Sequence, residues 1–267
     1  MTAVTGAHVL VTGGSEGIGL ATAAAFAARG ARVSLVARDP AKLAAARDRL
    51  GGLPAVASAD VTDRVALARA FGELVTAQGP VDILVTAAGA SEPGRFTELD
   101  DDAFARQLDL NVLGTVHACR LVVADMCARR RGHLVLVSSV AGFLGIYGFS
   151  AYAPTKFAVR GFGEALRAEL APCGVRVSIV YPPDTDTPGL RRENERKPAE
   201  TKAISATIPP VPAERVAAAI VRGVERDRLA VTVDPLSWLL LRAGGLCDPV
   251  LRRIEDRTVR RVQRRGV

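Results

Sequence analysis

Short runs of apolar residues alternate with longer helical stretches along most of this chain, and this alternation constrains its fold more than any other feature. Six runs are expected to form strands: His8–Val11, Arg32–Val36, Ala55–Ser58, Ile83–Thr86, His133–Val137 and Arg176–Val180. Each is apolar almost throughout, as parallel strands are when helices cover both faces of a sheet. Five helical segments are expected with them: Ile18–Ala28, Pro40–Leu50, Arg64–Thr76, Asp101–Arg129 and Ala151–Leu170. The pattern predicts an α/β fold of the Rossmann type, a doubly wound parallel sheet with helices on both faces.

The chain is expected to form one such domain over residues 1–234, followed by a basic, amphipathic helical extension over residues 235–267. Its 267 residues suit a single large α/β domain, and no internal repeat or linker divides them. The polar, proline-rich stretch 183–212 is too long for an ordinary connection, so we expect a substrate loop or lid there.

Charge is concentrated in the extension, where eight arginines stand against three acidic residues and leave +5 of the +7 carried by the whole chain. The remaining body is close to neutral, so we do not expect nucleic acid as a partner.

The cysteines and histidines predict no metal site. Cys119, Cys127, Cys173 and Cys247 lack metal-ligand spacing, and the three histidines form no metal-binding motif. Free thiols are typical of a reducing compartment, and no apolar segment is long enough for a membrane span or placed like a signal peptide. We therefore expect a cytoplasmic protein, with peripheral membrane contact as an open alternative.

The first expected strand runs into a glycine-rich turn, Thr12-Gly13-Gly14-Ser15-Glu16-Gly17-Ile18-Gly19. Glycines let the backbone turn sharply and approach a pyrophosphate, whose charge is favoured by the amides at the start of the next helix. Such a turn alone has purely structural explanations. Its place between a strand and a helix in the first βαβ unit indicates dinucleotide binding. The candidate cofactor contacts here are Gly13, Ser15, Glu16, Gly17, Ile18 and Gly19.

The end of the second expected strand indicates which dinucleotide is bound. Chains that bind NAD usually offer a carboxylate there to the ribose hydroxyls, whereas this chain offers Arg38, with Lys42 one turn further. A guanidinium suits the 2′-phosphate of NADP(H), although a solvated strand-end charge is the plain alternative. Asp39 could cap the next helix or reach the ribose. We expect NADPH or NADP+ as the cofactor.

Asp60 and Val61 follow the third expected strand, where the adenine ring of such a cofactor would rest. Asp60 could accept a hydrogen bond from the exocyclic amine of adenine. It could also cap a helix that begins at Thr62, and both roles could coexist.

Tyr152 and Lys156 form the most specific pair in the sequence. A spacing of four on a helix places the phenol and the ammonium on one face, a turn apart. A phenol has a pKa of about 10, so acid–base catalysis near neutral pH needs a neighbouring positive charge that stabilises the phenolate. Any single Tyr-x-x-x-Lys is more often part of an ordinary surface helix, so the pair needs support from elsewhere.

Two further features supply that support. Ser138 and Ser139 end a buried strand just before a glycine-rich loop, where a hydroxyl can reach a substrate carbonyl. Asn111 lies inside the expected helix 101–129, although an amide is a mediocre helix former. An asparagine there can bend the helix and hold a water molecule next to the lysine.

The combined motifs resemble those of the short-chain dehydrogenase/reductase superfamily over roughly residues 7–187: Thr12-Gly-x-x-x-Gly-x-Gly19, Ala88-Gly89, Asn111, Ser139 and Tyr152-x-x-x-Lys156. The separation of thirteen between Ser139 and Tyr152 matches the usual spacing of that family, so Ser139 is preferred over Ser138.

The resemblance implies the following roles. Tyr152 donates a proton to the carbonyl oxygen, Ser139 polarises that oxygen, and Lys156 lowers the pKa of the tyrosine and holds the cofactor ribose. Asn111 supports the proton relay, and Ala88-Gly89 contacts the cofactor. The asparagine that the family usually carries three residues before this glycine is here Thr86, which weakens a structural bond after the fourth expected strand but not the chemistry. A homodimer or homotetramer is also expected from the resemblance.

The stretch after the sixth expected strand, Tyr181-Pro-Pro-Asp-Thr-Asp-Thr-Pro-Gly189, is the most distinctive. The superfamily resemblance implies cofactor contacts from Pro182, Thr185 and Thr187. With residues 145–152 and 193–201, the stretch is similar to the 3-ketodihydrosphingosine reductases, a family within that superfamily. This resemblance implies NADPH-dependent reduction of the 3-keto group of a long-chain sphingoid base, so we expect a long-chain keto-lipid as substrate.

Two other functions stay open. The chain could be another NADPH-dependent ketone reductase, acting on acyl, steroid or polyketide carbonyls. It could also be a regulatory protein that senses NADP(H) without catalysis, although the complete set of Ser139, Tyr152 and Lys156 argues against a sensor.

The extension has two interpretations. The eukaryotic members of the resembling family carry membrane-spanning segments, whereas this chain has only the apolar stretch 236–241 followed by arginines. Such a helix suits the surface of an anionic membrane, and it equally suits docking on its own protein, capping the substrate cleft or a partner subunit.

Overall fold

Seven parallel strands form the central sheet in the order β3-β2-β1-β4-β5-β6-β9. The computed structural model describes residues 1–264, apart from the side chains of residues 244–248. The strands of the sheet are β1 (His8–Thr12), β2 (Arg32–Ala37), β3 (Ala55–Ser58), β4 (Ile83–Thr86), β5 (Gly132–Val137), β6 (Val175–Tyr181) and β9 (Ala230–Thr232). The strand order reverses direction beside β1, as in a doubly wound sheet, so the predicted fold class is confirmed.

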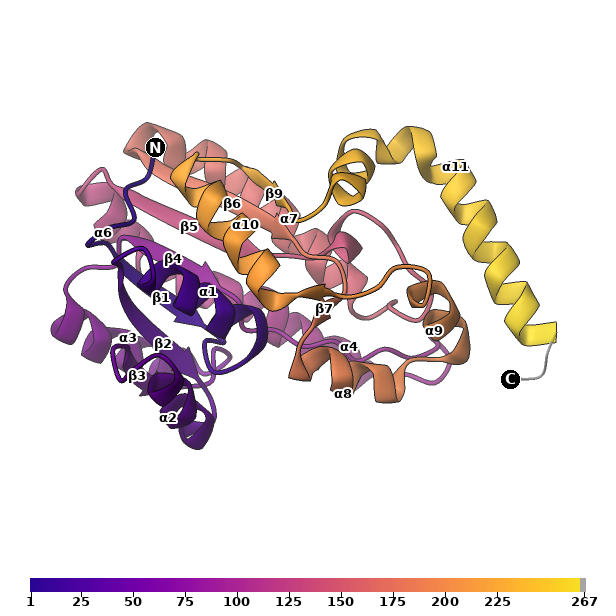
Figure 1. The fold of residues 1–267 in the computed structure, drawn as a ribbon, viewed down its shortest axis with the longest axis horizontal. Helices are drawn as coiled ribbons and strands as arrows, with labels where there is room; N and C mark the ends of the chain where they lie inside the picture. Colours follow the sequence, from indigo (N-terminus) through magenta and orange to yellow (C-terminus); the bar gives the residue numbers. More distant parts are fainter. Residues whose placement is uncertain (265–267) are drawn as a thin grey trace.

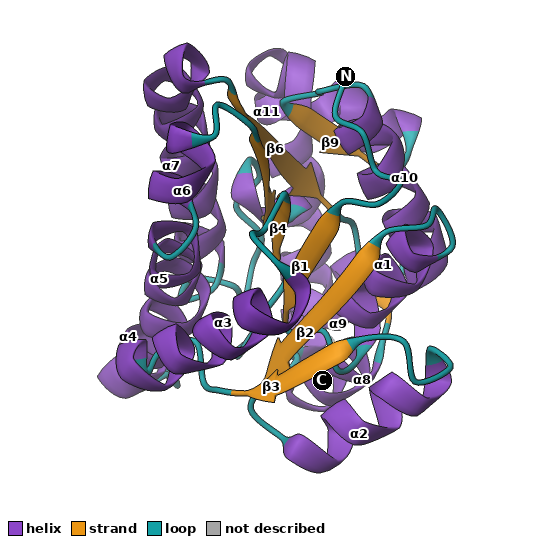
Figure 2. Cartoon of the chain, turned by 90° about the vertical axis from the view of Figure 1, so that its left-hand side faces the viewer, coloured by secondary structure: helices purple, strands orange, loops and turns teal. Residues whose placement is uncertain are grey.

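Helices cover both faces of the sheet (Figure 1). One layer consists of α1 (Gly17–Ala27), α2 (Pro40–Arg49) and α10 (Ala213–Glu225). The other consists of α3 (Arg64–Gln78), α4 (Asp101–Leu108), α5 (Gly114–Arg120), α6 (Val123–Ala128) and α7 (Ala153–Leu170). Figure 2 shows the sheet edge-on between these two layers. Successive residues of β1 serve opposite layers, since Leu10 packs with α3 and α7 while Val9 and Val11 pack with α1 and α10.

The six predicted strands match the observed ones within one residue at each end. The seventh strand, β9, was not predicted because three residues are too short to show a pattern. Its neighbour α10 was also missed, although its apolar face is buried against α1.

The single helix expected over Asp101–Arg129 is wrong. The segment is divided into α4, a π-helical turn over Asp109–Leu113, α5 and α6. A π turn displaces one carbonyl from its usual partner, and here the Thr115 hydroxyl donates to the Asn111 carbonyl at 2.9 Å. Gly114 follows the turn where a Cβ would come within 2.5 Å of the Val61 side chain, so this part of the segment lies close against the loop after β3.

The stretch 183–212 is mostly regular structure rather than an open loop. It contains β7 (Thr185–Asp186), α8 (Pro188–Arg196), α9 (Ala199–Ser205) and β8 (Val211–Pro212), and β7 pairs with β8 in a separate two-stranded sheet. The extension forms α11 (Pro235–Arg264), which contacts α9 and runs beside it in Figure 1.

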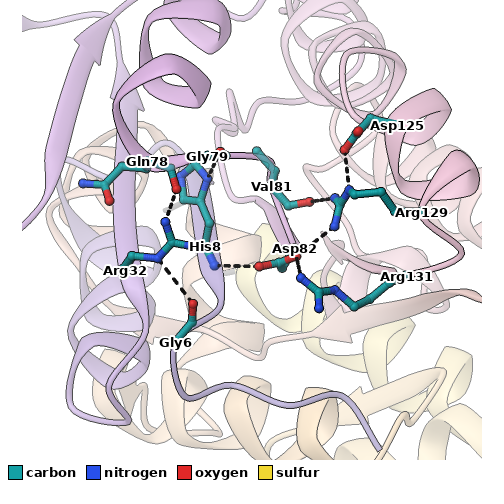
Figure 3. A network of polar contacts seen from close by, with 10 residues as sticks. All are labelled: Gly6, His8, Arg32, Gln78, Gly79, Val81, Asp82, Asp125, Arg129 and Arg131. Carbon is teal, nitrogen blue, oxygen red and sulfur yellow. Dashed lines mark hydrogen bonds and ion pairs between the residues drawn. The ribbon is translucent and has the colours of Figure 1, made fainter.

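Asp82, immediately before β4, ties three strands together at the end of the sheet opposite the glycine-rich turn (Figure 3). Its carboxylate accepts from the His8 amide at 3.0 Å, from Arg129 at 3.0 Å and from Arg131 at 2.8 Å. Burial by itself would raise the pKa of Asp82, but these hydrogen bonds outweigh burial and lower the pKa below its usual value. The native state is therefore stabilised by the ionised carboxylate, and this stabilisation is lost as the pH falls through the lowered pKa.

Replacing Asp82 by alanine is expected to lower the free energy of unfolding at neutral pH by about 2–3 kcal/mol. The change leaves a backbone amide and two guanidinium groups without their shared acceptor; the effect lies below the full range for buried pairs because Arg131 is exposed. Urea denaturation measures the difference. The control is Asp125→Ala, which removes another partner of Arg129 that is 54% exposed and should cost less than ~1 kcal/mol. Equal losses in the two variants would contradict the central role of Asp82.

Candidate functional site

Some of the predicted site residues lie around one cavity of about 970 Å³ at the carboxyl ends of the strands, whereas Arg38, Lys42, Asp60 and Asn111 are not in its lining. Because all seven strands are parallel, the segments that follow β1, β4, β5 and β6 meet at one edge of the sheet. The lining of the cavity includes Ile18 of α1, Gly89, Ser139, Tyr152, Lys156 and residues of the stretch 183–212.

The glycine-rich turn is folded so tightly that Gly13 and Gly19 have no room for a side chain. Gly13 has a φ of +69°, and a Cβ there would lie 2.6 Å from the Ala88 nitrogen. A Cβ on Gly19 would lie 2.2 Å from the Gly13 carbonyl oxygen. Gly17 also has a positive φ and faces the methyl group of Thr187. These glycines let the turn pack directly on the backbone after β4 and on itself. The amides at the start of α1 favour a phosphate group, so this tight backbone cradle fits a dinucleotide.

Arg38 and Lys42 lie beside this cradle. Arg38 follows β2, is 69% exposed, and has its guanidinium 3.5 Å from the Asp60 carboxylate. Lys42 donates to Glu16 at 2.9 Å, and Glu16 also binds Arg192 of α8. An exposed guanidinium next to an exposed lysine fits a 2′-phosphate. The Glu16 contacts connect the glycine-rich turn with α8.

The structure separates the roles that the sequence left open for two aspartates. Asp39 caps α2, because its carboxylate accepts from the amides of Ala41 and Lys42. Asp60 caps no helix: its carboxylate accepts from the Thr62 amide and hydroxyl in a local turn, and the helix cap of α3 is Asp63. The helix-cap interpretation of Asp60 is therefore wrong, because the helix begins two residues later than that interpretation required.

The loop after β4 is held against the catalytic candidates by Asn111. Its side-chain amide donates to the Ala90 carbonyl at 2.9 Å and to the Thr155 hydroxyl at 3.1 Å, and its oxygen accepts from the Ala90 amide at 3.0 Å. A Cβ on Gly89 would lie 2.9 Å from this oxygen and 3.5 Å from the Lys156 nitrogen. Asn111 and Lys156 thus meet around a glycine, and the Asn111 side chain positions the loop.

The two serines at the end of β5 differ in their contacts. The Ser138 hydroxyl donates to the Lys156 carbonyl at 2.9 Å and is buried, so it supports the backbone of α7. The Ser139 hydroxyl accepts from the Ala141 amide at 3.1 Å and lies close enough to Tyr152 to lower the pKa of its phenol. Of the two serines, Ser139 is the one that acts on the phenol.

Tyr152 and Lys156 lie one helical turn apart at the start of α7, as predicted from their spacing. The Lys156 nitrogen is 5.6 Å from the centre of the tyrosine ring and donates to the Val137 carbonyl at 3.0 Å. Burial lowers the pKa of Lys156 to about 8. Near neutral pH the side chain is therefore an ammonium that loses its proton in the mildly alkaline range.

The pKa of Tyr152 is raised rather than lowered. Burial is the largest cause, the negative charges of Glu193 and Asp184 add to it, and the hydrogen bond with Ser139 opposes it. The sequence pattern assigned Lys156 to lower this pKa, but in the chain by itself the phenol keeps its proton more firmly than a tyrosine in water. A protonated phenol is the form needed for an acid that donates to a carbonyl oxygen.

Sequence reasoning missed a charged cluster in the cavity wall. Lys197 lies 2.9 Å from Glu193 and 3.2 Å from Asp184, and its nitrogen is 5.7 Å from the centre of the Phe149 ring. The four-residue spacing of Glu193 and Lys197 was a visible signal, but such pairs are common on surface helices.

The described part of the chain has neither a metal-binding group of side chains nor a membrane-spanning helix. It contains no group of His, Cys, Asp and Glu side chains that could hold a metal ion, and none of its helices is both long and apolar enough to cross a bilayer. Cys119, Cys127 and Cys173 are free, whereas the side chain of Cys247 lies outside the described residues.

Comparisons with known proteins bear on this site. Residues 7–198 match the family model described as short chain dehydrogenase. A 3-ketodihydrosphingosine reductase of Bos taurus is 43% identical over 89% of this chain and 74% of its own length. A 3-dehydrosphinganine reductase of Danio rerio is 40% identical over 88% of this chain and 73% of its own. The structure of an actinorhodin polyketide ketoreductase variant with NADPH superimposes with a TM-score of 0.79 at 27% identity, over 87% of this chain and 97% of that one.

The lowered pKa of Lys156 predicts a loss of reductase activity at alkaline pH. As the pH rises through about 8, Lys156 loses its proton, and the positive charge that would stabilise a phenolate on Tyr152 disappears. We expect kcat/KM for ketone reduction with NADPH to fall above that pH, approaching about tenfold per pH unit. In Lys156→Arg, whose side chain stays charged, any remaining activity should hold to higher pH. A wild-type profile that is flat between pH 7 and 9.5 would contradict this assignment.

Proposed function

The chain belongs to the short chain dehydrogenase family, and from this premise we propose that it reduces the 3-keto group of a long-chain sphingoid base. It is an NADP(H)-dependent oxidoreductase. The observation that carries the substrate proposal is the cavity, whose lining combines the acid–base residues with a large group of aliphatic side chains. The names of the relatives, 3-ketodihydrosphingosine reductase and 3-dehydrosphinganine reductase, support the same choice.

Proton transfer in this proposal belongs to three residues. Bound NADPH supplies the hydride that reaches the carbonyl carbon. Tyr152 donates its phenolic proton to the carbonyl oxygen, and Ser139, which lies close enough to Tyr152 to lower its pKa, donates a hydrogen bond to the same oxygen. The buried Lys156 ammonium stabilises the phenolate that remains. Asn111 keeps the loop after β4 in place beside these groups.

The residues proposed to hold NADPH lie in the segments that follow the carboxyl ends of the strands. The pyrophosphate would lie on the glycine-rich turn at Gly13, Ser15 and Gly17–Gly19, with Glu16 supporting that turn through its ion pairs. Arg38 and Lys42 would bind the 2′-phosphate. The remaining proposed contacts are Asp60, Val61, Ala88, Gly89, Tyr152, Lys156, Pro182, Thr185 and Thr187.

The apolar part of the cavity fits a long hydrocarbon chain. Its wall is formed by α9, the segment after it, and α11, and the aliphatic side chains are those of Ile204, Ile208, Leu236, Leu240, Leu251 and Ile254. A volume of about 970 Å³ lies at the upper end of the range for small-molecule sites, ~300–1,000 Å³. A short, water-soluble ketone would leave much of this wall in contact with water.

The extension is proposed to contact anionic membrane while forming part of the cavity wall. The outward residues of α11 include several arginines, and near its start Trp238 is 54% exposed beside the exposed Leu239. Arginine with exposed tryptophan and leucine is the composition of helices that lie on a membrane surface. The protein would then encounter a substrate whose hydrocarbon chain partitions into lipid at the membrane surface.

A homodimer or homotetramer stays part of the proposal. The layer formed by α4, the π-helical turn, α5 and α7 lies along one side of the molecule in Figure 2. Its exposed large apolar side chains are those of Leu108, Leu113 and Phe157. Association through this layer would remove them from water.

The proposed reaction predicts that the purified chain converts 3-ketodihydrosphingosine to dihydrosphingosine with consumption of NADPH. Tyr152→Phe should lower turnover by about 10²–10⁴-fold while NADPH binding is kept, because only the proton donor is lost. Product analysis and cofactor titration measure the two effects. Turnover of short ketones alone would favour another ketoreductase function, such as one on polyketide carbonyls, and an active Tyr152→Phe variant would refute the assigned mechanism.

The proposed membrane contact predicts binding to vesicles that contain anionic lipid but not to neutral ones. The double variant Arg260→Gln/Arg264→Gln should weaken that binding by roughly 30-fold, at about 1 kcal/mol for each arginine. The matched control Arg47→Gln/Arg49→Gln removes two exposed arginines at the end of α2 and should leave binding unchanged. Vesicle flotation measures both, and equal effects from the two pairs would contradict a role specific to α11.

A further inference from the structure

A buried lysine is held between two carboxylates in the wall of the cavity. The Lys197 nitrogen lies 2.9 Å from Glu193 and 3.2 Å from Asp184, and the lysine side chain is only 1% exposed. Glu193 and Asp184 both line the cavity, one from α8 and the other from the loop after β6. Two carboxylates and one ammonium leave this cluster with a net charge of −1 when all three groups are ionised.

The cluster lies next to the reacting end of the cavity. The Lys197 nitrogen is 5.7 Å from the centre of the Phe149 ring, and that ring is 5.7 Å from the Tyr152 ring. Glu193 and Asp184 are also the two charges that raise the pKa of Tyr152, with Glu193 the stronger. A charged group bound at Glu193 would therefore act directly on the proton donor.

Glu193 has less positive charge around it than a buried carboxylate needs. Its side chain is 16% exposed, less than half the exposure of the Asp184 side chain at 37%. Burial raises the pKa of Glu193, and repulsion from Asp184 adds to this, so the attraction of Lys197 does not restore the usual value. A second cation at this position would restore the balance.

We propose that Glu193, positioned by Lys197, binds the protonated amine of the substrate and selects ketones that carry an amine on the neighbouring carbon. The inference rests on the proposed function, because 3-ketodihydrosphingosine has a primary amine on the carbon next to its ketone. With the ketone oxygen at Tyr152 and Ser139, that amine faces the carboxylates and the hydrocarbon chain extends toward α9 and α11.

The ammonium of the substrate then takes part in proton transfer as well as in binding. When no substrate amine is bound, the negative charge of Glu193 opposes formation of a phenolate on Tyr152. A bound ammonium offsets that charge at the moment when the phenol gives up its proton. A ketone of the same length without the amine leaves the charge in place, so the discrimination extends to kcat as well as to KM.

The test compares 3-ketodihydrosphingosine with an analogue of equal chain length that has hydrogen in place of the amine. For the wild type, kcat/KM should be about 10–100-fold higher for the amine, the range for a hydrogen bond to a charged group. Glu193→Gln should lower kcat/KM for the amine by a similar factor and should not lower the value for the analogue, because the charge that opposes the phenolate is removed as well. The control Glu169→Gln makes the same charge change at an exposed position near the end of α7, outside the lining of the cavity, and should keep the preference.

A second measurement does not depend on turnover. The inhibition constant of dihydrosphingosine, which carries the amine, should rise by about 10–100-fold in Glu193→Gln, while the affinity for NADPH stays unchanged and reports an intact fold. If Glu193→Gln keeps the preference for the amine, whether kcat/KM for both ketones falls equally or does not change, the role of Glu193 is overturned while the proposed reaction stays in place. Failure of the wild type to reduce 3-ketodihydrosphingosine would overturn the proposed reaction and the inference together.

Discussion

The close approach of backbone to backbone at the glycine-rich turn is the constraint on which the rest of the site depends. A Cβ on Gly13 or Gly19 would lie within 2.6 Å of main-chain atoms, so β1, the start of α1 and the end of β4 can meet only without side chains there. Because backbone cannot move aside as a flexible side chain can, this contact fixes where β4 ends. The same loop carries Gly89, which stands between Asn111 and Lys156. One series of close contacts thus connects the proposed cofactor cradle with the proposed catalytic lysine, Lys156.

Local sequence patterns predicted the parts of the fold that local physics decides. A strand covered on both faces is largely apolar, and β1 to β6 each contain at least three consecutive apolar residues. The division of the helix around Asn111 could not be read in the same manner. Its π turn depends on contacts with Ala90 and Thr155, which lie 21 and 44 residues away along the chain. The helix α8 had a readable start, since Thr187 caps it before Pro188, but its polar composition resembled that of a loop.

In the candidate site too, features set by local spacing could be predicted, whereas features set by distant segments could not. Spacing alone placed Tyr152 and Lys156 on one helical face, because four residues make about one turn. The electrostatics of the pair could not be predicted from spacing, since the charges that act on the phenol come from Asp184 and Glu193 on another segment. Ser138 and Ser139 show the difference in its simplest form. They are adjacent in the sequence, yet one supports the backbone of α7 and the other lowers the pKa of the phenol.

The two interpretations of the extension, docking on its own protein and contact with membrane, use different faces of α11. Leu251, Ile254, Glu255 and Thr258 follow the three- and four-residue spacing of one helical face, and all four line the cavity. Glu255 also accepts from the Tyr147 amide at 2.7 Å, which fixes this face near the loop that leads to Tyr152. Arg253, Arg257, Arg260 and Arg264 follow the same spacing on another, exposed face. Since one helix presents both faces, the proposed membrane contact would bring lipid next to the apolar wall that a long hydrocarbon chain needs, while the carboxylates at the far end hold the charged head of the substrate.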